Sequence, residues 1–215
     1  MILPAVIYTL LMFGGGATLS AAFGIPHDSV QKAAAYMAKV SLQIRWGSFC
    51  ELASAIPLGV FVATAVSRLR FLRVRAAGEV IALCGGVIAT GMLLISSLSI
   101  WSLTRPGIAE ADGAVRALQA MSFAGGGPGF TAPLGLFIAG ISIPAGLYRL
   151  IPRWLMWLGI VVAVACELST LTLLVWNFSW FIPVGRFVSV VWMIGVAVTL
   201  PSRRDASPKA AQPAI

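Results

Sequence analysis

Long runs of apolar residues, separated by short clusters of charge, dominate the chain. Three stretches contain no Asp, Glu, Lys or Arg: residues 1–27, 80–104 and 117–148. Each is longer than the roughly 20 apolar residues that a helix needs to cross the hydrocarbon core of a bilayer. Because lipid offers a backbone amide no hydrogen-bond partner, such segments must be helical. The pattern predicts an all-α, polytopic integral membrane protein.

Hydropathy and charge together predict six transmembrane helices in a single membrane domain that covers residues 1–200. Their approximate bounds are residues 4–24, 47–66, 80–101, 121–147, 155–175 and 181–200. Residues 201–215 are rich in Ala, Pro and charge, which predicts a disordered tail. The first span is interpreted as retained rather than as a signal peptide, since no positive charge precedes it.

The loops that flank these spans carry the charges that orient the chain. With the N-terminus cytoplasmic, nine of the 15 Lys and Arg residues fall on the inner side, close to the spans. Short cytoplasmic loops carry such an excess, so we expect both termini and the tail to be cytoplasmic. On the other side, Asp28 and Gln31 predict an N-cap for a short helix within residues 26–43, ahead of the second span. Residues 102–119 are predicted to be a loop.

Composition agrees with a membrane domain and narrows the partners. Hydrophobic residues make up 59% of the chain and charged residues 10%, whereas soluble domains contain about 25% charged residues. The net charge of +8 lies in short clusters rather than on a polar face with interleaved aromatic residues. We therefore expect the lipid bilayer, and no nucleic acid, as a partner.

Residues that bind cofactors or perform catalysis are scarce. The three cysteines, Cys50, Cys84 and Cys166, lie in apolar segments without C-x-x-C spacing. The single histidine, His27, disfavours haem and metal sites, which need more ligands. The chain also lacks G-x-S-x-G and H-E-x-x-H motifs, so an enzyme is not the favoured interpretation.

The fourth span opens on an unusual run of glycines. Gly125, Gly126 and Gly127 precede Pro128, and further Gly and Pro residues follow. One interpretation is a broken helix whose free backbone groups line a cavity, as in many transporters. The other is close helix packing through small residues.

Four charged residues lie within or at the ends of spans, where charge is costly and often functional. Glu51 lies in the second span and Glu167 in the fifth, and Arg45 and Arg186 approach from the same side of the membrane. They could form a polar cavity, in the outer half of the bilayer, that binds a small charged solute or relays protons. Alternatively, they form structural ion pairs, with the arginine stems reaching the headgroups.

The two carboxylates also lie in a tripeptide that occurs twice in the chain. Cys50-Glu51-Leu52 in the second span corresponds to Cys166-Glu167-Leu168 in the fifth, and a triple glycine occurs in both the first and the fourth span. Three spans per half would make these inverted repeats, which are common in transporters. Matches this short also arise by chance in apolar helices.

Several short strings resemble a family of bacterial multi-span membrane proteins, domain of unknown function 4386. They are scattered over residues 42–201 and read AIPLG (55–59), RLRFL (68–72), GGGPGF (125–130), LIPRWL (150–155) and ELS (167–169). The resemblance implies a multi-pass protein of the bacterial inner membrane with about six helices. It implies no activity, ligand or catalytic residue.

The sequence is compatible with two functions. The first is a small transporter, for a solute or coupled to protons, that uses Glu51, Glu167, Arg45, Arg186 and the broken fourth span. The alternative is a non-catalytic accessory or scaffold subunit, packed through its glycines in a homo-oligomer or a larger membrane complex. The transporter hypothesis predicts that Glu51 and Glu167 face one water-accessible cavity with an arginine within ion-pair reach.

Overall fold

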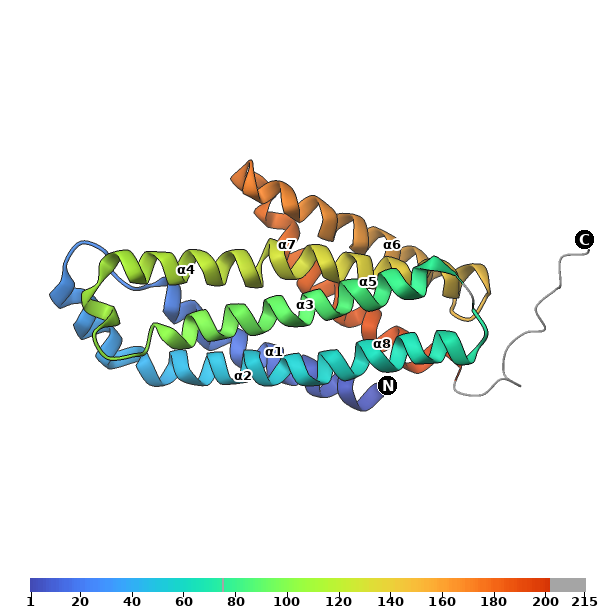
Figure 1. Ribbon diagram of the computed structural model, residues 1–215, viewed down its shortest axis with the longest axis horizontal. Coiled ribbons are helices and arrows are strands. Elements are labelled where there is room, and N and C mark those ends of the chain that lie inside the picture. The colour runs from blue at the N-terminus through green and yellow to red at the C-terminus, as the bar shows by residue number, and fades with distance from the viewer. Residues whose placement is uncertain (75, 202–215) are drawn as a thin grey trace, which may run out of the picture.

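The chain forms an elongated bundle of helices that run roughly along one axis (Figure 1). The computed structural model describes residues 1–74 and 76–201, without the side chains of residues 17–19, and this part of the chain contains no strand. Its α-helices are α1 (Ile2–Phe23), α2 (Val30–Phe71), α3 (Ala77–Ser102), α4 (Asp112–Gly126), α5 (Pro128–Leu147), α6 (Arg153–Leu168), α7 (Phe181–Pro183) and α8 (Ser189–Thr199). Short 3-10 turns cover Ile108–Glu110, Ser169–Leu173 and Trp176–Trp180, and a π-helical turn covers Val184–Val188.

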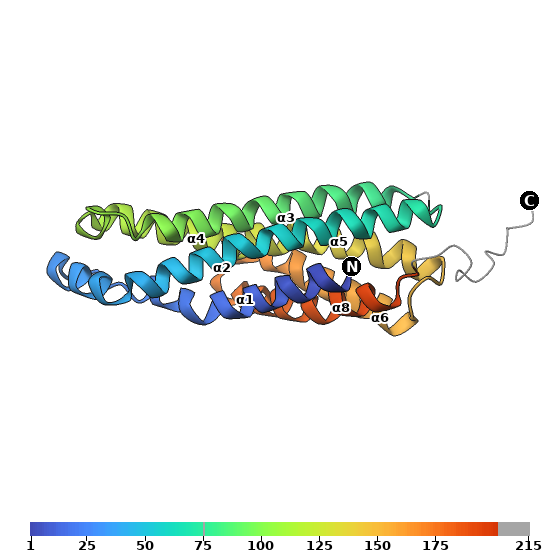
Figure 2. The same ribbon diagram turned by 90° about the horizontal axis from the view of Figure 1, so that it is seen from below.

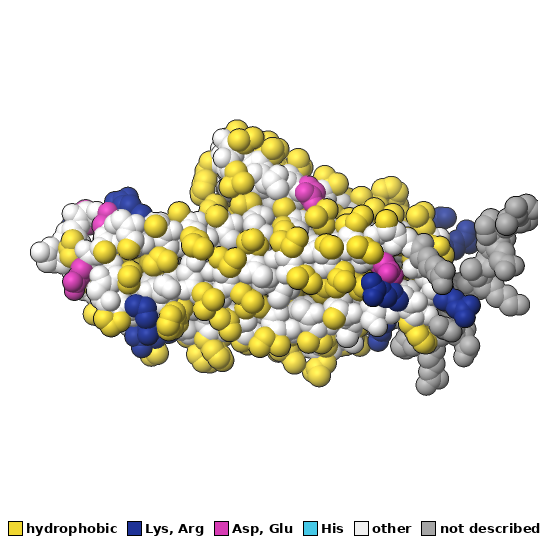
Figure 3. Space-filling model, viewed as in Figure 1, with side chains coloured by type: hydrophobic (Ala, Val, Ile, Leu, Met, Phe, Trp, Pro, Cys, Tyr) yellow, Lys and Arg dark blue, Asp and Glu magenta, His cyan; other side chains and the backbone are white. Residues whose placement is uncertain are grey.

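Six helical segments of the described chain are long and apolar enough to cross a membrane, as the hydropathy predicted. They are Ile2–Phe23, Val30–Phe71, Ala77–Ser102, Asp112–Leu147, Arg153–Leu173 and Trp176–Thr199. Charged side chains gather toward the two ends of the bundle, and hydrophobic side chains cover most of its length (Figure 3). The predicted disordered tail lies, apart from Pro201, outside the described residues.

Two segments continue as helix where a loop or a separate short helix was predicted. The helix expected within residues 26–43 is the first part of α2, which runs for 42 residues and is about 63 Å long at 1.5 Å per residue. The second half of the predicted 102–119 loop is the start of α4. The N-cap of α2 is Ser29 rather than Asp28, because the Ser29 hydroxyl accepts the amide of Lys32.

These extensions build a second hydrophobic core beside the main one. The main core follows α2, α3 and α5 and continues into α8, with Phe61, Phe137 and Trp192 buried at its centre. The second core joins the ends of α1 and α3 to the starts of α2 and α4, through residues such as Ile25, Met37, Val40 and Val115. From below, α1, α6 and α8 are seen on one side of the bundle and α2 and α3 on the other (Figure 2).

At each end of the bundle, polar contacts connect neighbouring segments of the chain. At one end, Arg70 pairs with Glu79 at 2.8 Å, and Arg68 donates to the carbonyl of Leu200 at 3.1 Å. At the other end, His27 Nδ1 lies 2.6 Å from an Asp112 oxygen, and this contact joins the α1–α2 loop to α4. The sides of the membrane on which these ends lie stay predictions from the charge pattern.

Candidate functional site

A buried ion pair joins the middle of α2 to the π-helical turn near the C-terminal end of the chain. Arg186 Nη2 donates to Glu51 Oε1 at 3.0 Å, and the Glu51 side chain is only 3% exposed. An ion pair in apolar surroundings gains strength from the low dielectric, but it must offset the cost of removing both charges from water. Further hydrogen bonds to the two side chains are therefore needed to offset this cost.

The break in the fourth span supplies one of these hydrogen bonds. Helix α4 ends at Gly126 and α5 begins at Pro128, with Gly127 between them in a non-helical conformation. In a continuous helix the amide of Phe130 would bond to the Gly126 carbonyl, but here it bonds to Gly127 instead. The free Gly126 carbonyl accepts a hydrogen bond from Arg186 Nη1 at 3.2 Å. The negative end of a helix dipole also favours a cation at this place.

Two serines complete the surroundings of Glu51. The Ser96 hydroxyl of α3 lies 3.4 Å from both carboxylate oxygens, and 3.2 Å from both the carbonyl and the hydroxyl of Ser122. A Cβ on Gly126 would lie 2.6 Å from the Ser96 oxygen. Because no side chain fits there, glycine at this position lets α4 approach the carboxylate.

The π-helical turn and its neighbours hold Arg186 in place. Helices that widen to a π turn often do so at functional sites. Gly185 lies so close to the Cys166 sulfur that a Cβ would come within 2.7 Å of it. The Ser189 hydroxyl donates a hydrogen bond to the Arg186 carbonyl at 2.8 Å, and the guanidinium lies 5.4 Å from the centre of the Phe130 ring.

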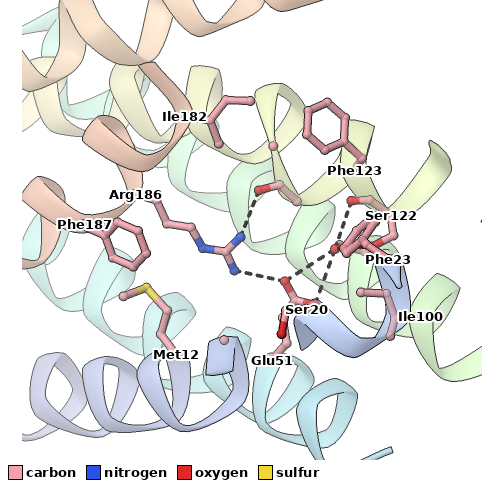
Figure 4. A pocket seen from close by; sticks show the side chains of 14 residues that line it. Met12, Ser20, Phe23, Glu51, Ile100, Ser122, Phe123, Ile182, Arg186 and Phe187 are labelled. Carbon is pink, nitrogen blue, oxygen red and sulfur yellow. Dashed lines mark hydrogen bonds and ion pairs between the residues drawn. The ribbon is translucent and has the colours of Figure 1, made fainter. Parts of the chain in front are cut away.

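The ion pair faces a pocket of about 320 Å³ (Figure 4), which is lined by Met12 of the main core and Ile100 of the second core. A volume of this size is at the lower end of the range for small-molecule sites. Side chains of Ser20, Glu51, Ser96, Ser122 and Arg186 provide its polar groups. The other lining residues are apolar or glycine: Met12, Gly16, Phe23, Ile100, Phe123, Gly126, Gly127, Ile182 and Phe187.

The structure does not bring all of the predicted site residues together. Glu167 is exposed at the end of α6 and does not line the pocket. Arg45 is exposed and donates at 3.5 Å to the carbonyl of Thr104. The prediction that both carboxylates share one cavity is therefore wrong, because the packing of α6 leaves Glu167 exposed. An arginine does lie within ion-pair reach of the other carboxylate, Glu51.

Both interpretations of the glycine run hold at once. Gly127 marks a true break before Pro128, while a Cβ on Gly125 would lie 3.3 Å from the backbone oxygen of Met92 in α3. Of the predicted set, Gly126 and Gly127 line the pocket, and Gly125 and Pro128 are buried beside it.

Ser96 and Ser122 line the site but were not predicted as site residues. A signal was present for the first, because Ser96, Ser97, Ser99 and Ser102 form a hydroxyl-rich run inside a stretch without charge. Ser122 lies in a region interpreted only through its glycines.

Comparisons with known proteins add no relatives: no family model, no curated protein and no solved structure matches this chain. The resemblance in the sequence strings stays a prediction.

Proposed function

We propose that the chain is an integral membrane protein that binds a small solute in the pocket at Glu51 and Arg186, without Glu167 and Arg45, and couples its movement to a proton. The observation that carries this proposal is the buried ion pair that faces the pocket. Charged residues inside membrane proteins are costly and mark solute or proton pathways. The sequence resemblance supports the bacterial inner membrane as its location.

Hydrogen bonding supports a role for Glu51 as a proton acceptor. Ser96 has a single hydrogen to donate. When Glu51 is ionised, Ser96 donates to it; when Glu51 is protonated, its O–H donates to Ser96, which turns to the Ser122 carbonyl. Rotation of one hydroxyl therefore satisfies both states of the carboxyl group.

The same contacts support a second candidate, the scaffold function. Arg186 ties the π-helical turn to α2 through Glu51 and to the end of α4 through Gly126. A purely structural ion pair would have these bonds and no solute.

Proton movement in reconstituted vesicles distinguishes the two functions. The purified chain is placed in vesicles that contain a pH-sensitive dye, and monocarboxylates, amines, amino acids and polyols are added in turn. We expect at least one class to move protons with wild type and not with Glu51→Gln. Glu167→Gln is the matched control, because it changes the same residue type in the same Cys-Glu-Leu context outside the pocket. Equal rates for wild type and Glu51→Gln with every solute would contradict the transport function.

A further inference from the structure

Of the two charged groups that face the pocket, only the carboxylate of Glu51 can become neutral. An arginine side chain stays protonated at any physiological pH, whereas a carboxylate becomes neutral when it takes up a proton. The Glu51 and Arg186 pair can therefore be neutral or carry one positive charge, and it has no state with a net negative charge. A site that alternates between these states binds an anion when it is protonated and releases it when it is not.

Arg186 can accept a second carboxylate without leaving its place. Its Nη1 and Nη2 atoms donate to the Gly126 carbonyl and to Glu51, and a guanidinium has five N–H donors in total. The bond to Gly126 holds the cation when Glu51 is protonated and turns to Ser96. The N–H group that paired with Glu51 is then free for an anion, and the planar fork of arginine matches a carboxylate.

The rest of the pocket favours an apolar tail on this anion. Its apolar lining side chains include Met12, Phe23, Ile182 and Phe187. Phe23 of α1 and Phe187 of the π-helical turn line the pocket and are each about half exposed, at 48% and 47%, so the pocket is open at these side chains. Both residues belong to segments apolar enough to span a membrane. The open part of the pocket is therefore bordered by apolar segments.

We propose that the solute is a monocarboxylate with a short apolar tail, bound as an anion at Arg186 while Glu51 takes up one proton. The inference rests on the proposed function and names its solute class. The titratable groups that interact with Glu51 are Arg186 from the π-helical turn and Tyr8 from α1, while α3 and α4 face it with Ser96 and Ser122. Anion and proton together are neutral, so their passage moves no net charge. The bonds formed are all hydrogen bonds or ion pairs.

Calorimetry with hexanoate, in detergent micelles and in two buffers of different ionisation enthalpy, tests this class. We expect wild type to take up about one proton for each hexanoate bound. Glu51→Gln should bind hexanoate with no proton uptake, because the site is then permanently positive. Arg186→Gln should weaken binding about tenfold or more, through loss of a charged hydrogen bond. Arg186→Lys, which keeps the charge, should recover part of it, and Glu167→Gln should behave as wild type.

The uncharged and cationic analogues give the opposing outcomes. Hexanol should bind more weakly than hexanoate, and hexylamine should not compete with it. If hexylamine binds as tightly as hexanoate, or if wild type binds hexanoate without proton uptake, the inference is overturned. The proposed function still stands in that case if another solute moves protons through wild type and not through Glu51→Gln. If no solute moves protons in this way, the proposed function is contradicted, whatever the result with hexanoate.

Discussion

The same three residues, Cys-Glu-Leu, occur in two regions of the molecule with opposite results for the carboxylate. In α2, Glu51 is buried and pairs with Arg186 at 3.0 Å. In α6, Glu167 is exposed, and no described residue forms a side-chain hydrogen bond or ion pair with its carboxylate. Val164, one turn earlier on α6, is an exposed apolar neighbour, at 54%.

The cysteines of the two tripeptides nevertheless have similar surroundings. Cys50 packs against Gly15 of α1, and Cys166 packs against Gly135 of α5. In both cases the glycine lies on the preceding span. The triple glycines that first indicated a repeat do not correspond in this way, because Gly126 packs against α3. Local packing is thus shared between the regions, whereas the partners of the carboxylates come from distant segments and differ.

The largest expected effect comes from removing one member of the buried pair. Glu51→Leu or Arg186→Met alone should lower the free energy of unfolding by about 3 kcal/mol. The first leaves the mostly buried guanidinium without its counter-charge, and the second leaves the buried carboxyl group either unpaired or forced to take up a proton. The double variant should recover most of this loss, since two apolar side chains of similar volume replace the pair. Denaturation of the purified chain in micelles measures all four proteins. Additive losses in the double variant would mean that the two residues stabilise the fold independently.

Hydropathy predicted the six spans because lipid leaves an apolar segment little choice but helix. It did not predict that the short helix expected within residues 26–43 continues into α2, nor that α4 begins inside the predicted 102–119 loop. Both helical extensions form because Met37 and Val40 of α2 bury against Ile25 and Val115 in the second core. Contacts between segments that are distant in the sequence do not produce a periodic pattern in either segment, so this sequence alone does not predict them.

The sequence predicted the charged residues of the site but not which of them contact each other. Charge inside an apolar span singled out both Glu51 and Arg186, but they are 135 positions apart in the sequence. Helix α6 is apolar on all sides, so its sequence does not show which face meets the bundle. Glu167 was therefore assigned to the pocket with the same argument as Glu51, and only the packing of α6 separates them.

An intermediate effect should follow from filling the glycine contacts that the two regions share. A Cβ on Gly15 would lie 2.9 Å from the Cys50 Cβ, and one on Gly135 would lie 2.7 Å from the Cys166 Cβ. Gly15→Ala and Gly135→Ala should each lower the free energy of unfolding by about 1 to 3 kcal/mol through overpacking. Gly14→Ala is the control, because a Cβ there meets no atom within 4 Å, and it should stay within about 0.5 kcal/mol of wild type. A large loss at only one of the two glycines would show that the shared packing is not equivalent.

The smallest effect is expected at Glu167, where the difference between the regions is tested most directly. A carboxylate in the last turn of a helix opposes the helix dipole, which costs about 0.3 to 1 kcal/mol, and Glu167 has an exposed apolar neighbour in Val164. Glu167→Leu should therefore leave the free energy of unfolding in micelles unchanged or raise it by up to about 1 kcal/mol. A clear loss of stability would mean that the carboxylate has a partner in the folded protein, and the two regions would then differ in the identity of that partner rather than in its presence.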